Sequence, residues 1–127
     1  MTDMRTPRHR VRGLGAAGSG TAHFWLQRVT ALANIPLVLG LIAILAALAG
    51  SSYETARELL GNPLVAIALL LLVVSASFHM RLGMQAIIED YVHKPALKTA
   101  CLVANTLIPA TIAVASIYAL LRISVGS

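Results

Sequence analysis

The chain has 127 residues, of which 57% are hydrophobic and 12% are charged, and its formal net charge is +5. Its mean hydropathy of +0.79 exceeds what a water-soluble domain of this length can hide in a core, so lipid must cover part of its surface. The single cysteine, Cys101, excludes an internal disulfide and a cysteine-ligated iron–sulfur cluster within the chain. We expect Cys101 to act as a small buried apolar residue.

The first 20 residues are basic and rich in glycine, without apolar periodicity. Residues 13–18 read GLGAAG and formally match the G-x-G-x-x-G phosphate-binding motif. No predicted strand precedes the motif and a membrane span follows it, so we reject dinucleotide binding. We predict a flexible basic cytoplasmic tail at 1–20, followed by a membrane domain at 21–127.

Three long runs of the chain carry no Asp, Glu, Lys or Arg: residues 29–53, 59–80 and 99–121. Each can supply the roughly 20 helical residues that cross a hydrocarbon core. The first run starts too late and is too long for a signal peptide, so we interpret it as a retained span. The fold class is therefore predicted to be all-α, an integral membrane protein with three transmembrane helices at about 28–50, 63–90 and 97–122.

The charges between these runs predict the orientation in the membrane. The first 28 residues contain five arginines and one aspartate, and Lys94 and Lys98 lie between the second and third runs. The segment between the first two runs holds Glu54, Arg57 and Glu58, and we expect it to form one or two helical turns. By the positive-inside rule, the N-terminus lies in the cytoplasm and the C-terminus in the periplasm. The basic balance thus reflects membrane orientation and not nucleic-acid binding.

The start of the first span places an arginine where the helix enters lipid. Trp25 suits the aromatic belt at the headgroup level, and Arg28 follows it by three residues. Arg28 can either extend toward lipid phosphates or face an anionic partner. The second span starts at Asn62-Pro63, a strong helix-start signal, with Asn62 as the cap.

His79 lies within the second span, where the sequence changes from aliphatic to polar. At 100° per residue, His79 shares one helical stripe with Ser75, Gly83, Ala86 and Asp90. The small residues on this stripe would let a planar group or another helix approach closely. Three interpretations remain open for the histidine: a hydrogen bond to a hydroxyl on a neighbouring helix, ligation of haem iron, or a proton relay.

The other three histidines, His9, His23 and His93, are predicted to lie on the cytoplasmic side. A second haem ligand would therefore have to come from another polypeptide.

Asp90 and Tyr91 close the second span at the cytoplasmic surface. A tyrosine hydroxyl can donate to a quinone carbonyl, and a carboxylate can relay protons; an aromatic-belt tyrosine beside a solvated acid is the alternative. Tyr91 lies about 120° around the helix and roughly 18 Å along it from His79. The two residues therefore belong to separate sites.

The motifs HMRLG at 79–83 and DYVHKP at 90–95, with SGTAHFWLQRVTA at 19–31, resemble those of a known family. It is the hydrophobic, D-type membrane-anchor subunit of succinate dehydrogenase (respiratory complex II), in its α-proteobacterial and mitochondrial form. The resemblance covers the tail, the first-span entrance, the second helix and the following loop. His93 is an additional residue compared with members that read Asp-Tyr-Val-Lys-Pro.

The resemblance implies a role for each candidate residue. His79 would be an axial ligand of haem b iron, with Arg28 and His23 near the haem propionates. Tyr91 and Asp90 would line the ubiquinone site. The chain would sit in the bacterial inner membrane rather than the mitochondrial one, with a C-type anchor that supplies the second haem ligand. Its other partners would be an iron–sulfur subunit and a flavoprotein subunit, which oxidises succinate.

Three alternatives remain. A quinol:fumarate reductase anchor would use the same fold in the reverse direction. A small transporter would be expected to carry an acid at membrane depth, which this sequence lacks. In a purely structural assembly protein, His79 would be a packing residue.

Overall fold

The computed structural model describes residues 4, 6–8 and 20–126, so most of the predicted tail at 1–20 lies outside the described part of the chain. Within that part, three helices are long and apolar enough to cross a membrane: α2 (Gly20–Leu48), α4 (Pro63–Tyr91) and α5 (Pro95–Val125). A short helix, α3 (Tyr53–Gly61), joins α2 to α4. The predictions of an all-α fold and of three spans are confirmed. Each long helix extends past at least one end of its predicted span.

The predicted helix starts are present in the structure. The side chain of Asn62 accepts a hydrogen bond from the Leu64 amide at 3.0 Å, and Pro63 occupies the first turn of α4. Ser52 caps α3 by accepting from the Thr55 amide at 3.2 Å. Between α2 and α3 the chain turns at Gly50, whose φ of 75° is costly for other residues. Local sequence signals therefore set the ends of the elements.

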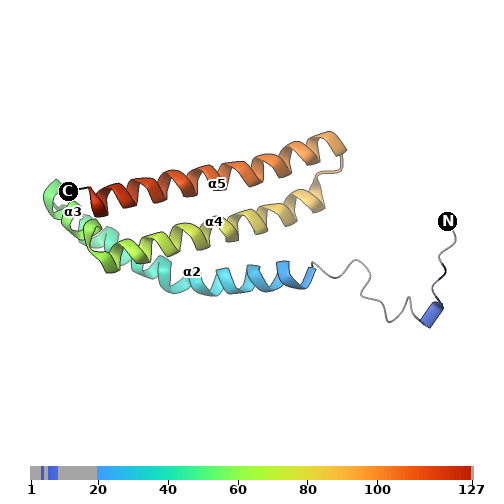
Figure 1. The fold of residues 1–127 in the computed structure, drawn as a ribbon, viewed down its shortest axis with the longest axis horizontal. Helices are drawn as coiled ribbons and strands as arrows, with labels where there is room; N and C mark the ends of the chain where they lie inside the picture. The colour runs from blue at the N-terminus through green and yellow to red at the C-terminus, as the bar shows by residue number, and fades with distance from the viewer. Residues whose placement is uncertain (1–3, 5, 9–19, 127) are drawn as a thin grey trace.

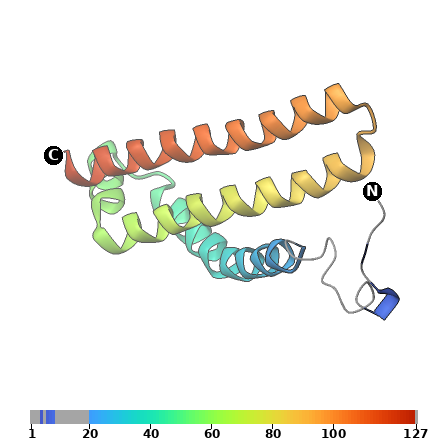
Figure 2. The ribbon, with the colours of Figure 1, turned by 45° about the vertical axis from the view of Figure 1, so that its right-hand side comes forward.

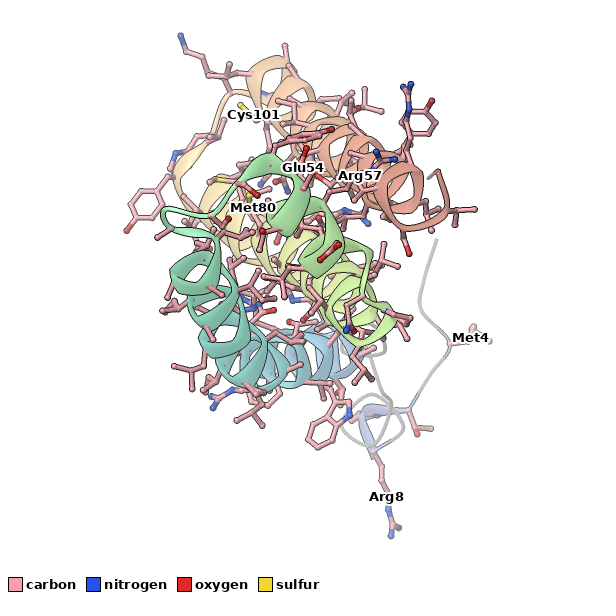
Figure 3. The ribbon with its side chains drawn as sticks, turned by 90° about the vertical axis from the view of Figure 1, so that its left-hand side faces the viewer. Met4, Arg8, Glu54, Arg57, Met80 and Cys101 are labelled. Atoms are coloured by element: carbon pink, nitrogen blue, oxygen red, sulfur yellow. The ribbon has the colours of Figure 1, made fainter. Side chains whose placement is uncertain are left out.

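Helix α4 lies between α2 and α5, which contact opposite sides of it (Figures 1 and 3). In Figure 2, α4 and α5 run side by side, whereas α2 is inclined to them. Apart from Pro109 of α5, the apolar residues that are buried in the described chain all belong to α4: Ala66, Leu72, Leu82 and Ile88. Each flanking helix contributes one buried polar residue, Thr30 on α2 and Asn105 on α5. Helix α4 is therefore the centre of the structure.

The first residues of α2 and the α4–α5 connection lie at one end of the molecule, and α3 lies at the other (Figure 1). Helix α3 packs across the ends of α4 and α5, where Arg57 donates a hydrogen bond to the Gly126 carbonyl (Figure 3). None of the most apolar stretch of α2 is buried within the chain, and only 11% of the corresponding stretches of α4 and α5 is. Lipid or other subunits must cover these surfaces.

Candidate functional site

The stripe of α4 that carries Ser75, His79 and Gly83 faces α2. His79 Nδ1 lies 3.2 Å from Thr30 Oγ1, and Ser75 Oγ donates to the Thr30 carbonyl oxygen at 3.4 Å. A Cβ atom added at Gly83 would lie 3.4 Å from Nε2 of Gln27. Small residues on this stripe were expected to admit a planar group or a helix; at Gly83 the neighbour is a helix of the same chain.

Among the described residues, Thr30 is the hydrogen-bond partner of the His79 side chain. It is 7% exposed, and its Oγ1 lies 2.8 Å from the Leu26 carbonyl oxygen and 3.1 Å from that of Gln27. Such bonds to the preceding turn are the usual way in which a threonine satisfies its hydroxyl inside a helix. The hydroxyl thus contacts both its own helix backbone and the imidazole of α4.

Helix α2 carries a polar face that sequence reasoning treated only in part. His23, Gln27, Thr30 and Asn34 follow one another at helical spacing, which brings them to one side of α2. His23 Nε2, Gln27 Oε1 and Asn34 Oδ1 are buried and have no hydrogen-bond partner among the described residues. Buried polar atoms without a partner are rare in proteins. This face therefore has unused hydrogen-bonding capacity for water or a ligand.

Arg28 does not lie on this face. It is exposed, and its guanidinium carbon sits 4.8 Å from the centre of the Phe24 ring. At 100° per residue, Arg28 lies roughly 140° around α2 from His23. The structure therefore directs the two predicted propionate residues to different sides of the helix, His23 toward α4 and Arg28 outward.

Asp90 and Tyr91 are the last two residues of α4, and both are exposed; Tyr91 retains 78% of its accessible surface. Neither side chain makes a hydrogen bond to any residue in the described part of the chain. The preceding residue, Glu89, does have partners: its carboxylate accepts from Gln85 at 2.8 Å, and its carbonyl oxygen accepts from Lys98 Nζ at 3.3 Å. The Asp90–Tyr91 pair is thus available to another molecule, at a different depth from His79.

No group of three or more His, Cys, Asp or Glu side chains converges within residues 20–126. Any metal at His79 must therefore take its remaining ligands from elsewhere. Sequence reasoning named His79 but gave no role to Thr30 or Gln27. The signal was present, because polar residues at 23, 27, 30 and 34 repeat with the period of a helix face.

Residues 2–119 match the family model described as "Succinate dehydrogenase/Fumarate reductase transmembrane subunit". The chain belongs to this family. The "Succinate dehydrogenase hydrophobic membrane anchor subunit" of Paracoccus denitrificans is 30% identical over 122 residues, covering 96% of this chain and 94% of the relative. The protein of the same name from Rickettsia bellii (strain RML369-C) is 32% identical over 117 residues, covering 92% and 94%.

The "Succinate dehydrogenase membrane anchor subunit" of Reclinomonas americana is 35% identical over 78 residues, or 59% of this chain and 65% of the relative. No solved structure matches the chain. Membership of the succinate dehydrogenase/fumarate reductase transmembrane family confirms the prediction of a multi-pass membrane-anchor subunit of succinate dehydrogenase.

Proposed function

We propose that the chain holds the iron of haem b through His79 and forms part of a ubiquinone site through Tyr91 and Asp90. Electrons from succinate would reach this site through an iron–sulfur subunit, after oxidation of succinate on a flavoprotein subunit. The second axial ligand would come from a C-type anchor subunit. The observation that carries the proposal is the arrangement of the His79 imidazole, a single membrane-depth histidine held by one of its two ring nitrogens.

The residues around His79 fit an axial haem ligand. Nδ1 contacts Thr30, whereas Nε2 makes no hydrogen bond within the described part of the chain. Metal-ligating histidines commonly bind through one ring nitrogen while the other is held by a hydrogen bond. A bound haem would supply one-electron redox chemistry. The unpartnered Nε2 of His23 and the guanidinium of Arg28 are the groups of α2 that would pair with a haem propionate.

The quinone role rests on Tyr91 and Asp90 at the end of α4. The tyrosine hydroxyl would donate a hydrogen bond to a quinone carbonyl and so fix the headgroup. The carboxylate of Asp90 would pass protons between the headgroup and water. Their exposure supports this role, because a site shared with other subunits must be open on the isolated chain.

The charge pattern supports a cytoplasmic location for the start of α2 and for the α4–α5 connection, which lie at the same end of the molecule (Figure 1). Tyr91 and Asp90 would then face the cytoplasm, on the side where a peripheral dehydrogenase docks. The C-terminus would face the periplasm, across a bacterial inner membrane.

Two other functions are favoured by specific observations. The family description includes fumarate reductase, and a quinol:fumarate reductase anchor would use the same fold in the reverse direction. The hydrogen bond between His79 and Thr30 also suits a histidine that only packs two helices together. The spectrum of His79→Ala distinguishes such a packing histidine from a haem ligand.

The test is a pair of variants measured in the purified complex. His79→Ala is expected to abolish or markedly alter the dithionite-reduced b-type spectrum, because the iron loses an axial ligand. Tyr91→Phe is the matched control: it should keep the spectrum but lower succinate–quinone turnover about tenfold or more, while dye-linked succinate oxidation continues. An unchanged spectrum in His79→Ala would refute ligation, and equal loss of both activities in Tyr91→Phe would refute the quinone role.

A further inference from the structure

The hydrogen bonds of the Thr30 hydroxyl indicate whether Thr30 or His79 is the donor in the contact between them. A hydroxyl has one proton and two acceptor lone pairs. The shortest contact of Thr30 Oγ1 is to the Leu26 carbonyl oxygen, at 2.8 Å, and a carbonyl oxygen can only accept. The proton of Thr30 is therefore directed to its own helix. With the proton so placed, the lone pairs of Oγ1 are available to His79 Nδ1 at 3.2 Å, and the ring nitrogen would be the donor.

This assignment corresponds to one tautomer of His79. A neutral imidazole carries one proton, and if Nδ1 holds it, Nε2 holds the lone pair. We propose that Thr30 is a positioning residue that keeps His79 in the Nδ1–H tautomer, with the Nε2 lone pair directed to haem iron. This inference rests on the proposed role of His79 as a haem ligand. It adds a role for α2, the helix that carries Thr30.

The surroundings keep Thr30 in place. Thr30 is 7% exposed, so water has little access with which to replace it as the acceptor. Ser75, one turn before His79 on the same stripe, donates to the Thr30 carbonyl oxygen at 3.4 Å. Two contacts from α4 therefore converge on one residue of α2, one to its side chain and one to its backbone. The orientation of the imidazole is coupled to the packing of the two helices.

The hydrogen bond also affects the electronic character of the ligand. An acceptor at Nδ1–H raises the basicity of the imidazole, which strengthens donation from Nε2 and favours the ferric state. Removing the acceptor should make the iron easier to reduce without removing the ligand. The reduction potential of the haem is therefore a readout that a purely structural threonine would not move.

The experiment compares variants in the purified complex by redox titration of the b-type spectrum and by electron paramagnetic resonance of the ferric haem. Thr30→Val keeps the shape of the side chain and removes the acceptor. At a fixed ambient potential, its ferrous-to-ferric ratio should rise severalfold, with altered g-values. Thr30→Ser keeps the hydroxyl and should titrate close to the wild type.

Thr111→Val is the matched control. Thr111 Oγ1 also donates to the carbonyl oxygen four residues earlier, at 2.8 Å, but Thr111 is exposed and its hydroxyl contacts no other helix in the described chain. This variant should leave the titration unchanged. If Thr30→Val does not assemble, Thr30→Cys replaces it, because a thiol sulfur is only a weak acceptor and should shift the ratio in the same direction.

The outcomes separate this inference from the proposed haem ligation. If His79→Ala abolishes the b-type spectrum and Thr30→Val, or Thr30→Cys in its place, titrates as the wild type, the positioning role of Thr30 is wrong while ligation stands. A shift in Thr30→Ser as large as that in Thr30→Val would also overturn it, because a variant that keeps the hydroxyl would then behave like one that lacks it, and the shift would not report the loss of the acceptor. An unchanged spectrum in His79→Ala would refute ligation itself.

Discussion

Helix α4 meets its two neighbours through interfaces of different character. Toward α5, the buried Asn105 donates from Nδ2 to the Arg81 carbonyl oxygen at 2.9 Å, and the groove beside it is lined by otherwise apolar residues of both helices. Toward α2, Thr30 contacts His79, and the buried atoms Gln27 Oε1 and Asn34 Oδ1 have no partner among the described residues. At the α4–α5 interface the buried amide of Asn105 is hydrogen-bonded, whereas at the α2–α4 interface two buried amide oxygens are not.

The difference indicates how the three helices divide their roles. A buried polar group without a partner costs free energy, so a purely structural interface would lose such groups or pair them. The α4–α5 interface meets that condition and holds the two helices together. The α2–α4 interface keeps polar atoms that stability alone does not require. We therefore associate α2–α4 with the proposed haem site and α4–α5 with the support of α4.

The largest expected effect comes from forcing α2 and α4 apart. In Gly83→Leu the new side chain would extend into Gln27, since a Cβ atom alone would already reach 3.4 Å from its Nε2. Overpacking of this kind costs about 1–3 kcal/mol. We expect a lower thermal stability of the purified complex and a reduced haem content, measured from the pyridine haemochrome.

Two further glycine variants serve as controls for this prediction. Gly83→Ala should be tolerated, because 3.4 Å is an ordinary contact distance. Gly40→Leu, also within a spanning helix, should be nearly neutral because a Cβ atom there meets nothing within 4 Å. Normal haem content in Gly83→Leu would mean that close approach of α2 is not needed at the site.

A smaller effect is expected at the α4–α5 interface. Asn105→Leu removes the bond to the Arg81 carbonyl oxygen, which is worth about 0.6 kcal/mol on average and up to about 1.7 kcal/mol for side-chain hydrogen bonds within membranes. Titration of the full chain with a denaturing detergent, followed by circular dichroism, should show the loss. Thr106→Val, at the neighbouring exposed position, should not change the midpoint.

The sequence predicted the elements well because local signals determine them. Charge-free runs located the three spans, and Asn62-Pro63 marked the start of α4. The pattern of small residues around His79 correctly indicated close approach at Gly83. It left open whether a helix or a planar group would approach, because periodicity identifies a face and not its neighbour.

The pairing of α2 with α4 is a long-range property that the sequence did not reveal. Thr30 appeared in the sequence only as a hydroxyl in an apolar span, and the choice of His79 as its partner depends on the register between two helices. Arg28 and His23 seemed neighbours in sequence, yet five residues of α-helix direct them to different sides. In the proposed sites, the remaining residues would belong to other chains, which this sequence does not contain.

The smallest expected effect is the one that distinguishes the two interfaces most directly. Gln27 and Asn105 both carry amides and both face α4, but Gln27 Oε1 is buried without a partner in the described chain, whereas Asn105 is bonded. Gln27→Leu removes a buried amide oxygen that accepts no hydrogen bond from the described residues, so no hydrogen bond at that oxygen is lost. In the same detergent titration, it should leave the free energy of unfolding within about 0.5 kcal/mol of the wild-type value or raise it.

The same Gln27→Leu chain, assembled into the complex, should show a changed haem spectrum if the amide faces water or a propionate at the site. Asn105→Leu should show the reverse pattern, with a lower stability and an unchanged spectrum. If Gln27→Leu instead destabilises the chain as much as Asn105→Leu does, then Gln27 stabilises the fold through contacts equivalent to those of Asn105. The two sides of α4 would then be alike, and the unpartnered atoms of α2 would no longer indicate a site.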